Sequence, residues 1–95
     1  MHFPTKSNAS ALAPIIVWLT GRVAFHTDQP PTDVDPDTPL TELGIASVSA
    51  VSLCGEIEDQ WELELDPTVV FDYPTVAEMA VFIAGEVDFA DRKAS

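Results

Sequence analysis

Apolar residues recur every three or four positions in three stretches of this chain. In residues 10–26 they are Leu12, Ile15, Ile16, Leu19 and Val23. In residues 47–61 they are Val48, Val51, Leu53 or Cys54, Ile57 and Trp61, and from residue 76 onward they are Val76, Met79, Ala80, Ile83 and Val87. This spacing places side chains on one face of an α-helix, so each stretch predicts an amphipathic helix with a buried side.

Boundary signals support the first and last of these helices. Ser10 is a plausible N-cap, and Pro14 is compatible only with a first turn, so the first helix is expected to begin near these residues. It is expected to end around His26. Thr75 and Glu78 have the spacing of a capping box, which predicts the start of the last helix.

Residues 27–38 form a Pro- and Asp-rich segment between the first two helices. Apolar Val34, Leu40 and Leu43 can attach this segment and the residues after it to a core, so we expect an ordered loop rather than a linker. A short turn of helix is possible at residues 39–43. Gly44 then ends it and supplies a bend in the backbone.

A further short helix is predicted after Asp66-Pro67, where an N-cap precedes a proline at the first helical position, and it runs through Val70 or Phe71. Three main helices, one short helix and a long first loop bury a core only as a compact bundle. The fold class is therefore all-α, a four-helix bundle. We expect a flexible lead-in at residues 1–9, one domain at residues 10–88 and a flexible tail at residues 89–95.

Charge is distributed very unevenly along the chain. The 95 residues carry 16 Asp+Glu and four Lys+Arg, a formal net charge of -12. All the acids lie between Asp28 and Asp91, and no Lys or Arg occurs between Arg22 and Arg92. Such a surface disfavours nucleic acids and anionic membranes and attracts basic partners. The alternative, that the acids only maintain solubility, has about equal weight.

Residues 11–19 are apolar but predict neither a leader nor a span. Only Lys6 precedes them as a positive charge, no small-x-small cleavage site follows, and they are too short to cross a bilayer. One cysteine, Cys54, allows no internal disulfide and is compatible with a reducing compartment. We therefore expect a cytoplasmic protein without a targeting segment.

Two kinds of chemistry are disfavoured by the pattern of polar residues. Asp33-x-Asp35-x-Asp37 begins like an EF-hand loop, but Thr38 and Gly44 stand where glycine and glutamate are needed. Ser47 and His26 lack any surrounding nucleophile-elbow motif, so a catalytic triad is not expected. No cluster has zinc-ligand spacing, and Cys54 on the apolar stripe is interpreted as a core residue.

Ser47 remains as the candidate functional residue. It follows the Leu43-Gly44 turn and begins an apolar, helix-period run. Its hydroxyl would lie at the positive end of a helix, where amide N–H groups lack partners and a phosphate is stabilised.

The residues around Ser47 resemble acyl carrier domains of polyketide and fatty-acid synthases. Leu43, Gly44, Ser47 and Val48 match the family's modification motif, and residues 67–75, ending in Phe71-Asp72-Tyr73-Pro74-Thr75, match the run before its last helix. The similarity extends from about Ile15 to Ile83. It implies the acyl-carrier type of four-helix bundle, a carrier domain at residues 10–88, and a covalent 4′-phosphopantetheine, donated by coenzyme A, on Ser47.

The resemblance also implies how such a protein works. The carrier is not an enzyme; it holds acyl intermediates as thioesters for polyketide or lipid-like biosynthesis. Its implied partners are a phosphopantetheinyl transferase, an acyl-loading enzyme (an acyltransferase or fatty-acyl-AMP ligase) and a ketosynthase or other pathway enzymes. It is expected to act as a monomer. Val48, Glu56 and Asp59 would face the partners, although an ordinary solvated helix face is the competing interpretation for the acids.

One residue departs from the family pattern. Ala46 stands before Ser47 where the family usually has Asp, which helps the transferase arrange its magnesium and substrate. The absence of this carboxylate implies weaker priming by typical transferases, or a dedicated transferase. Two alternatives stay open: a peptidyl carrier of a nonribosomal peptide synthetase, and an unmodified acidic adaptor that retains the carrier fold.

Overall fold

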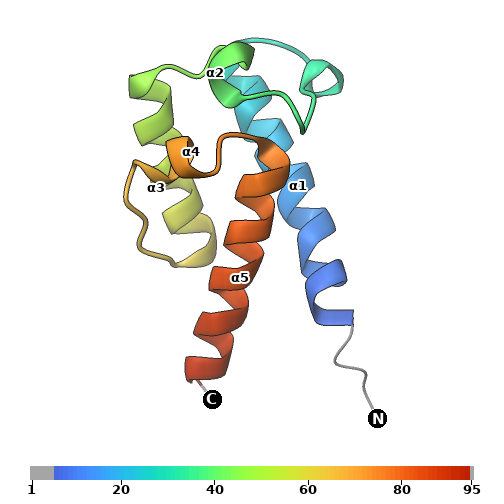
Figure 1. Ribbon diagram of the computed structural model, residues 1–95, viewed down its shortest axis with the longest axis vertical. Coiled ribbons are helices and arrows are strands. Elements are labelled where there is room, and N and C mark those ends of the chain that lie inside the picture. Colours follow the sequence, from blue (N-terminus) through green and yellow to red (C-terminus); the bar gives the residue numbers. More distant parts are fainter. Residues whose placement is uncertain (1–5, 95) are drawn as a thin grey trace.

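The computed structural model describes the backbone of residues 6–94 and the side-chain burial of residues 12–89. In chain order its elements are α1 (Lys6–Thr27), the 3-10 helix η1 (Pro31–Asp33), α2 (Leu40–Leu43), α3 (Ser47–Trp61), α4 (Val69–Asp72) and α5 (Val76–Ala94). The described residues contain helices and no strand, which confirms the all-α fold class. Figure 1 shows α1 and α5 side by side, with the short α4 between α3 and α5.

The predicted helices are present, but some boundaries differ. Helix α1 begins at Lys6, so Pro14 lies inside the helix rather than in its first turn. Helix α5 is described through Ala94, into the segment expected to be a tail, and α4 begins at Val69. Of the predicted lead-in at residues 1–9, residues 6–9 belong to α1 and residues 1–5 lie outside the described residues, as does residue 95 at the end of the predicted tail; the domain boundaries stay a prediction.

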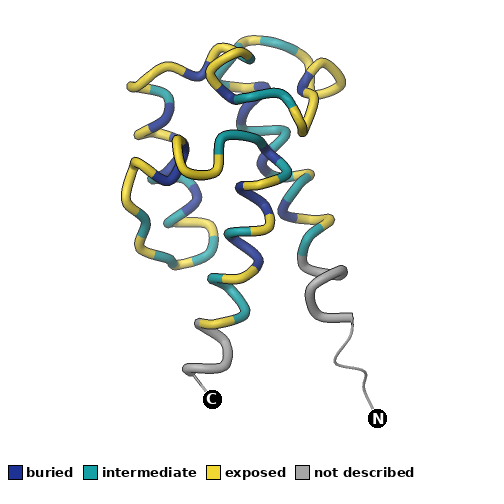
Figure 2. The backbone as a smooth tube through the Cα atoms, in the orientation of Figure 1, coloured by how far each residue is buried: buried dark blue, intermediate teal, exposed yellow. Residues whose placement is uncertain are grey.

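The core is built from the facing sides of α1, α3 and α5 together with Val34, Leu40, Ile45 and α4 (Figure 2). Its most deeply buried large side chains are Leu19, Val23, Leu40, Leu53, Ile57, Val70, Val76, Met79 and Ile83. Burying each of these stabilises the fold by about 1.5–3 kcal/mol relative to exposure. The edge-to-face pair of Trp18 and Trp61, with centroids 4.8 Å apart, joins α1 to the end of α3.

The predicted apolar stripe of α3 is partly wrong. The buried residues of this helix are Ala50, Leu53, Cys54 and Ile57, whereas Val48 and Val51 are 81% and 56% exposed. At 100° per residue, Val48 and Val51 fall on the opposite side from Leu53 and Ile57. The start of α3 therefore presents valines to solvent.

The long loop is ordered in the way its apolar residues predict. Val34 and Leu40 are buried, and Leu43 is packed against the core. Two backbone hydrogen bonds fix the loop to the start of α5: Leu40 N–H donates to Pro74 O at 2.7 Å, and Ala77 N–H donates to Pro36 O at 3.0 Å. The end of this loop, which leads to Ser47, is thereby held against the bundle.

Within the described residues, no helix has both the length and the apolar character needed to cross a membrane.

Candidate functional site

A tight turn places the start of α3. Gly44 ends α2 with φ 117° and ψ 6°, and its N–H donates to the carbonyls of Leu40 and Thr41. A residue with a side chain rarely adopts this φ. Ile45 follows, buried, with its N–H donating to Leu40 O at 2.9 Å. The next residues, Ala46 and Ser47, are therefore turned out to the surface.

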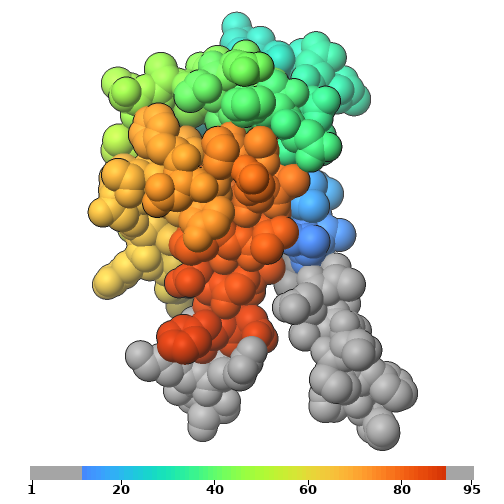
Figure 3. Space-filling model, in the orientation of Figure 1, coloured from blue at the N-terminus to red at the C-terminus, as the bar shows by residue number. Residues whose placement is uncertain are grey.

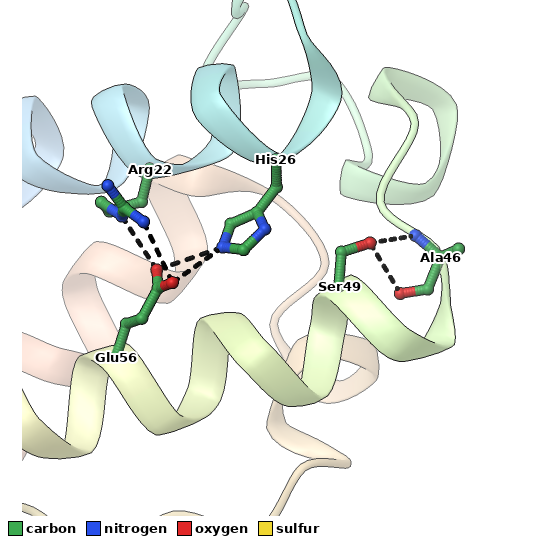
Figure 4. A network of polar contacts seen from close by, with 5 residues as sticks. All are labelled: Arg22, His26, Ala46, Ser49 and Glu56. Atoms are coloured by element: carbon green, nitrogen blue, oxygen red, sulfur yellow. Dashed lines mark hydrogen bonds and ion pairs between the residues drawn. The ribbon is translucent and has the colours of Figure 1, made fainter.

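Ser47 is the first residue of α3 and is exposed. Ala46, the N-cap, is extended and its methyl group accepts no hydrogen bond, so the N-cap side chain satisfies none of the N–H groups that begin α3. Ser49 makes the reciprocal contact: its Oγ accepts from Ala46 N–H at 3.0 Å and donates to Ala46 O at 3.3 Å (Figure 4).

This arrangement fits a phosphate attached to Ser47. The hydroxyl lies at the positive end of a 15-residue helix, and no acidic side chain occupies the first turn of α3. Both features favour negative charge at this point. An esterified phosphate here would be exposed, as the attachment of a long flexible arm requires.

Glu56, predicted to face partners, is engaged inside the molecule. Its carboxylate accepts from Arg22 Nε at 2.9 Å and Nη2 at 3.0 Å, and His26 Nε2 lies 3.0–3.1 Å from both oxygens (Figure 4). The hydrogen bonds from Arg22 lower the pKa of Glu56 most; partial burial opposes this shift, and His26 adds to it. The same contact raises the pKa of Arg22. Glu56 therefore ties α3 to α1.

Sequence reasoning missed Arg22 and His26 as partners of Glu56. A signal was present, because these two basic residues are four positions apart and share one face of α1. The pairing spans 34 residues, however, and depends on how α1 packs against α3. His26 hydrogen-bonds to Glu56, which gives it a partner other than Ser47.

Of the other predicted partner-facing residues, Val48 is 81% exposed and Asp59 is exposed. The carboxylate of neighbouring Glu58 is instead bound within the molecule, where it accepts from Leu65 N–H at 2.8 Å. Beside Val48, the exposed apolar side chains are Val51 and, on α4, Phe71 at 59%. Helix α4 packs on α3. Helix α3 thus presents Val48 and Val51 to solvent close to its start, and neighbouring α4 presents Phe71.

The disfavoured chemistries find no support in the geometry. Asp33, Asp35 and Asp37 are exposed, and within the described residues no three His, Cys, Asp or Glu side chains are grouped to hold a metal ion. Cys54 is buried in the core, as predicted, and burial raises the pKa of its thiol.

Comparison with known proteins places this geometry in a class. The family described as PP-binding, phosphopantetheine attachment site, matches residues 18–83, which include Ser47. The fold resembles a free-standing peptidyl carrier protein of Acinetobacter baumannii (TM-score 0.78, 34% identity, covering 80% of this chain and 95% of that one). It also resembles the acyl carrier protein LipD of Actinoplanes friuliensis (TM-score 0.68, 34% identity, 92% and 97% covered). The molecule is a carrier protein.

The curated relatives are large polyketide synthases. Phenolphthiocerol synthesis polyketide synthase type I Pks15/1 of Mycobacterium bovis is 42% identical over 55 residues, 58% of this chain and 3% of its own length. A phenolphthiocerol/phthiocerol polyketide synthase of Mycobacterium tuberculosis is 30% identical over 78 residues, 82% of this chain and 4% of its own. This chain therefore spans only a few per cent of these relatives.

The chain belongs to the PP-binding family, and it is an acyl carrier domain of polyketide synthase type. Its cofactor is a covalently attached 4′-phosphopantetheine, and its function is to tether biosynthetic intermediates. Carrier domains are in general non-catalytic. The peptidyl-carrier interpretation is not favoured over this one, although one peptidyl carrier shares the fold.

Proposed function

We propose that Ser47 is the residue that carries the 4′-phosphopantetheine arm. The observation that supports this most is its position as the exposed first residue of α3, directly after the left-handed Gly44 turn and inside the matched family region. The arm ends in a thiol, which holds an acyl group as a thioester. Tethering raises the effective concentration of that group at successive enzymes.

The chain supplies a nucleophile and its orientation. In the attachment reaction Ser47 Oγ forms a bond to the phosphorus of coenzyme A that bears pantetheine. The pyrophosphate bond to 3′,5′-ADP breaks, and the hydroxyl proton passes to a base of the transferase. Gly44 turns the serine outward, and Ser49 fixes the backbone of Ala46 beside it. Because Ala46 offers no carboxylate, the transferase would provide the magnesium ligands itself.

The partners that we propose are a phosphopantetheinyl transferase, an acyl-loading enzyme and a ketosynthase, consistent with the polyketide synthase relatives. Val48, Val51 and Phe71 would form the contact surface, with Asp59 further along α3 and Glu56 excluded by its own ion pair. We further propose that the protein is non-catalytic, monomeric and cytoplasmic. The free Cys54 supports only the last of these, because thiols stay reduced in the cytosol.

Mass spectrometry tests the attachment site. Incubation of the chain with coenzyme A, magnesium and a broad-specificity transferase should add one phosphopantetheine, and Ser47→Ala should add none. Ser52→Ala is the matched control, since Ser52 is an exposed serine of the same helix, and it should be modified like the wild type. Modification of the Ser47→Ala variant would refute the proposal, as would the absence of modification in an Ala46→Asp variant that restores the carboxylate before Ser47.

A further inference from the structure

Two aromatic rings stack at the junction of α4 and α5. Tyr73 follows α4, and Phe82 lies on the second turn of α5, with ring centroids 4.5 Å apart and an interplanar angle of 21°. Phe82 packs against the core, whereas Tyr73 is 36% exposed. The partly buried ring thus holds the exposed one in a fixed orientation.

A hollow opens to solvent beside this pair. Its volume is about 600 Å³ and its lining residues are Asp72, Tyr73, Ala77, Glu78, Val81 and Phe82. Its lining is mainly apolar, and Val81 is 60% exposed. A second, smaller hollow of about 210 Å³ shares Asp72, Tyr73 and Phe82 with the first. Figure 3 shows the surface of this segment, residues 72–82, facing the viewer above the end of α5.

Carboxylates surround the rings. Asp72 and Glu78 are exposed at the larger hollow, and Glu64 and Asp66 are exposed at the smaller one. Asp66 accepts from the N–H and hydroxyl of Thr68, which lowers the pKa of this carboxyl and keeps it charged. No Lys or Arg occurs between Arg22 and Arg92 in the sequence. Within the described residues, neither Asp72 nor Glu64 has an ion-pair partner.

The apolar lining, the exposed ring and the carboxylates together determine which chemical group fits the hollow. A purely apolar group would desolvate unpaired carboxylates, and an anion would be repelled. A guanidinium group meets both requirements, because it is planar, weakly hydrated, stacks on aromatic rings and pairs with carboxylates through two parallel hydrogen bonds. The compact, strongly hydrated ammonium of lysine fits the apolar lining less well.

We propose that the hollow between α4 and α5 receives an arginine side chain of a partner protein, stacked on Tyr73 and paired with Asp72, since the Glu78 carboxylate already accepts from the hydroxyl of Thr75 at 3.4 Å. Pro74, next to Tyr73, accepts the N–H of Leu40, which ties this segment to α2. This inference goes beyond carrier function and does not depend on modification of Ser47.

Titration of the unmodified ¹⁵N-labelled chain with the peptide acetyl-Gly-Arg-Gly-amide tests the proposal, with acetyl-Gly-Lys-Gly-amide as the equal-charge probe. The arginine peptide should shift the amide signals of Asp72, Tyr73, Glu78 and Phe82 at least threefold more than the lysine peptide does. Tyr73→Leu, which keeps an apolar side chain but removes the ring, should abolish this preference.

Two charge variants complete the test. Asp72→Asn should weaken arginine binding severalfold, whereas Glu42→Gln, which removes one exposed charge on α2, should leave it nearly unchanged. Both changes are at exposed positions, so the fold should persist. Equal responses to both peptides, shifts spread over all the acidic loops, or equal effects of the two charge variants would each overturn the proposal. Transferase is not needed, so failure here leaves the assignment of Ser47 intact.

Discussion

The backbone at Gly44 illustrates how one residue positions a site. Its φ of 117° lies in the left-handed region, and a Cβ there would meet Thr27 Cγ2 at 3.4 Å. Gly55, in the middle of α3, has no such constraint, because a Cβ there would meet nothing within 4 Å. Substitution by alanine is therefore expected to change the free energy of unfolding in opposite directions at the two glycines.

Gly44→Ala should lower the free energy of unfolding by about 1–2 kcal/mol, because alanine is strained at this φ. Gly55→Ala should raise it by about 0.5–1 kcal/mol, through helix propensity alone. Urea denaturation followed by circular dichroism measures both values. Stabilisation by Gly44→Ala would contradict the left-handed turn at this residue.

Residue-level reasoning from sequence predicted the Gly44 bend and the position of Ser47 at the start of a helix, because both depend on local chemistry. It wrongly placed Val48 and Val51 on the buried stripe, since a run with apolar residues on several faces does not say which face is covered. It also could not tell that Glu56 is paired, because Arg22 lies 34 positions away.

At the scale of one element, α3 begins without a capping side chain. Ala46→Asp supplies an acceptor for the first-turn N–H groups and a negative charge at the positive end of the helix. We expect it to raise the free energy of unfolding of the unmodified chain by about 1 kcal/mol. Ala46→Asn separates the two effects, because it caps without charge. If neither variant is more stable than the wild type, the first-turn N–H groups of α3 already have hydrogen-bond partners of another kind.

The ion pair of Glu56 with Arg22, which joins α1 and α3, should make the free energy of unfolding depend on pH. Because the folded-state pKa of Glu56 is lowered from its ordinary 4.5, its contribution is fully present above that pH and is lost as pH falls through the folded-state value. Glu56→Gln should lower the free energy of unfolding by about 1 kcal/mol at neutral pH. The deficit should shrink below about pH 4.5.

Denaturation curves at pH 7, 5 and 3.5 give this comparison. Asp59→Asn is the matched control, since Asp59 is an exposed acid of the same helix whose side chain makes no hydrogen bond or ion pair within the described residues, and it should change stability little at any of these pH values. A constant deficit for Glu56→Gln across the series would show that the ion pair does not contribute.

Element-level prediction succeeded where signals were local. Periodicity and capping residues gave the three main helices and the position of the short α4. The 3-10 helix at Pro31–Asp33 was missed, and the bonds of the loop to Pro74 and Ala77 join segments that no local pattern connects. Such contacts arise from packing of the whole bundle.

For the whole molecule, repulsion among carboxylates dominates the electrostatics. With a net charge of -12, screening by salt should weaken repulsion in the folded state more than it weakens the pair of Arg22 and Glu56. Raising NaCl from about 10 mM to about 200 mM should increase the Tm by roughly 5 °C. KCl at equal ionic strength should do the same. A fall in Tm would mean that attraction, not repulsion, prevails.

The antiparallel packing of α1 and α5 brings the beginning of one and the end of the other to the same pole of the bundle, whereas α3 begins at the opposite pole (Figure 1). The length of α3 alone, about 22 Å, separates these two poles. A fluorophore, an affinity handle or a solid support attached at the start of α1 or the end of α5 would therefore lie at the pole opposite to Ser47. Attachment there is expected to leave Ser47 accessible to the partner enzymes proposed above.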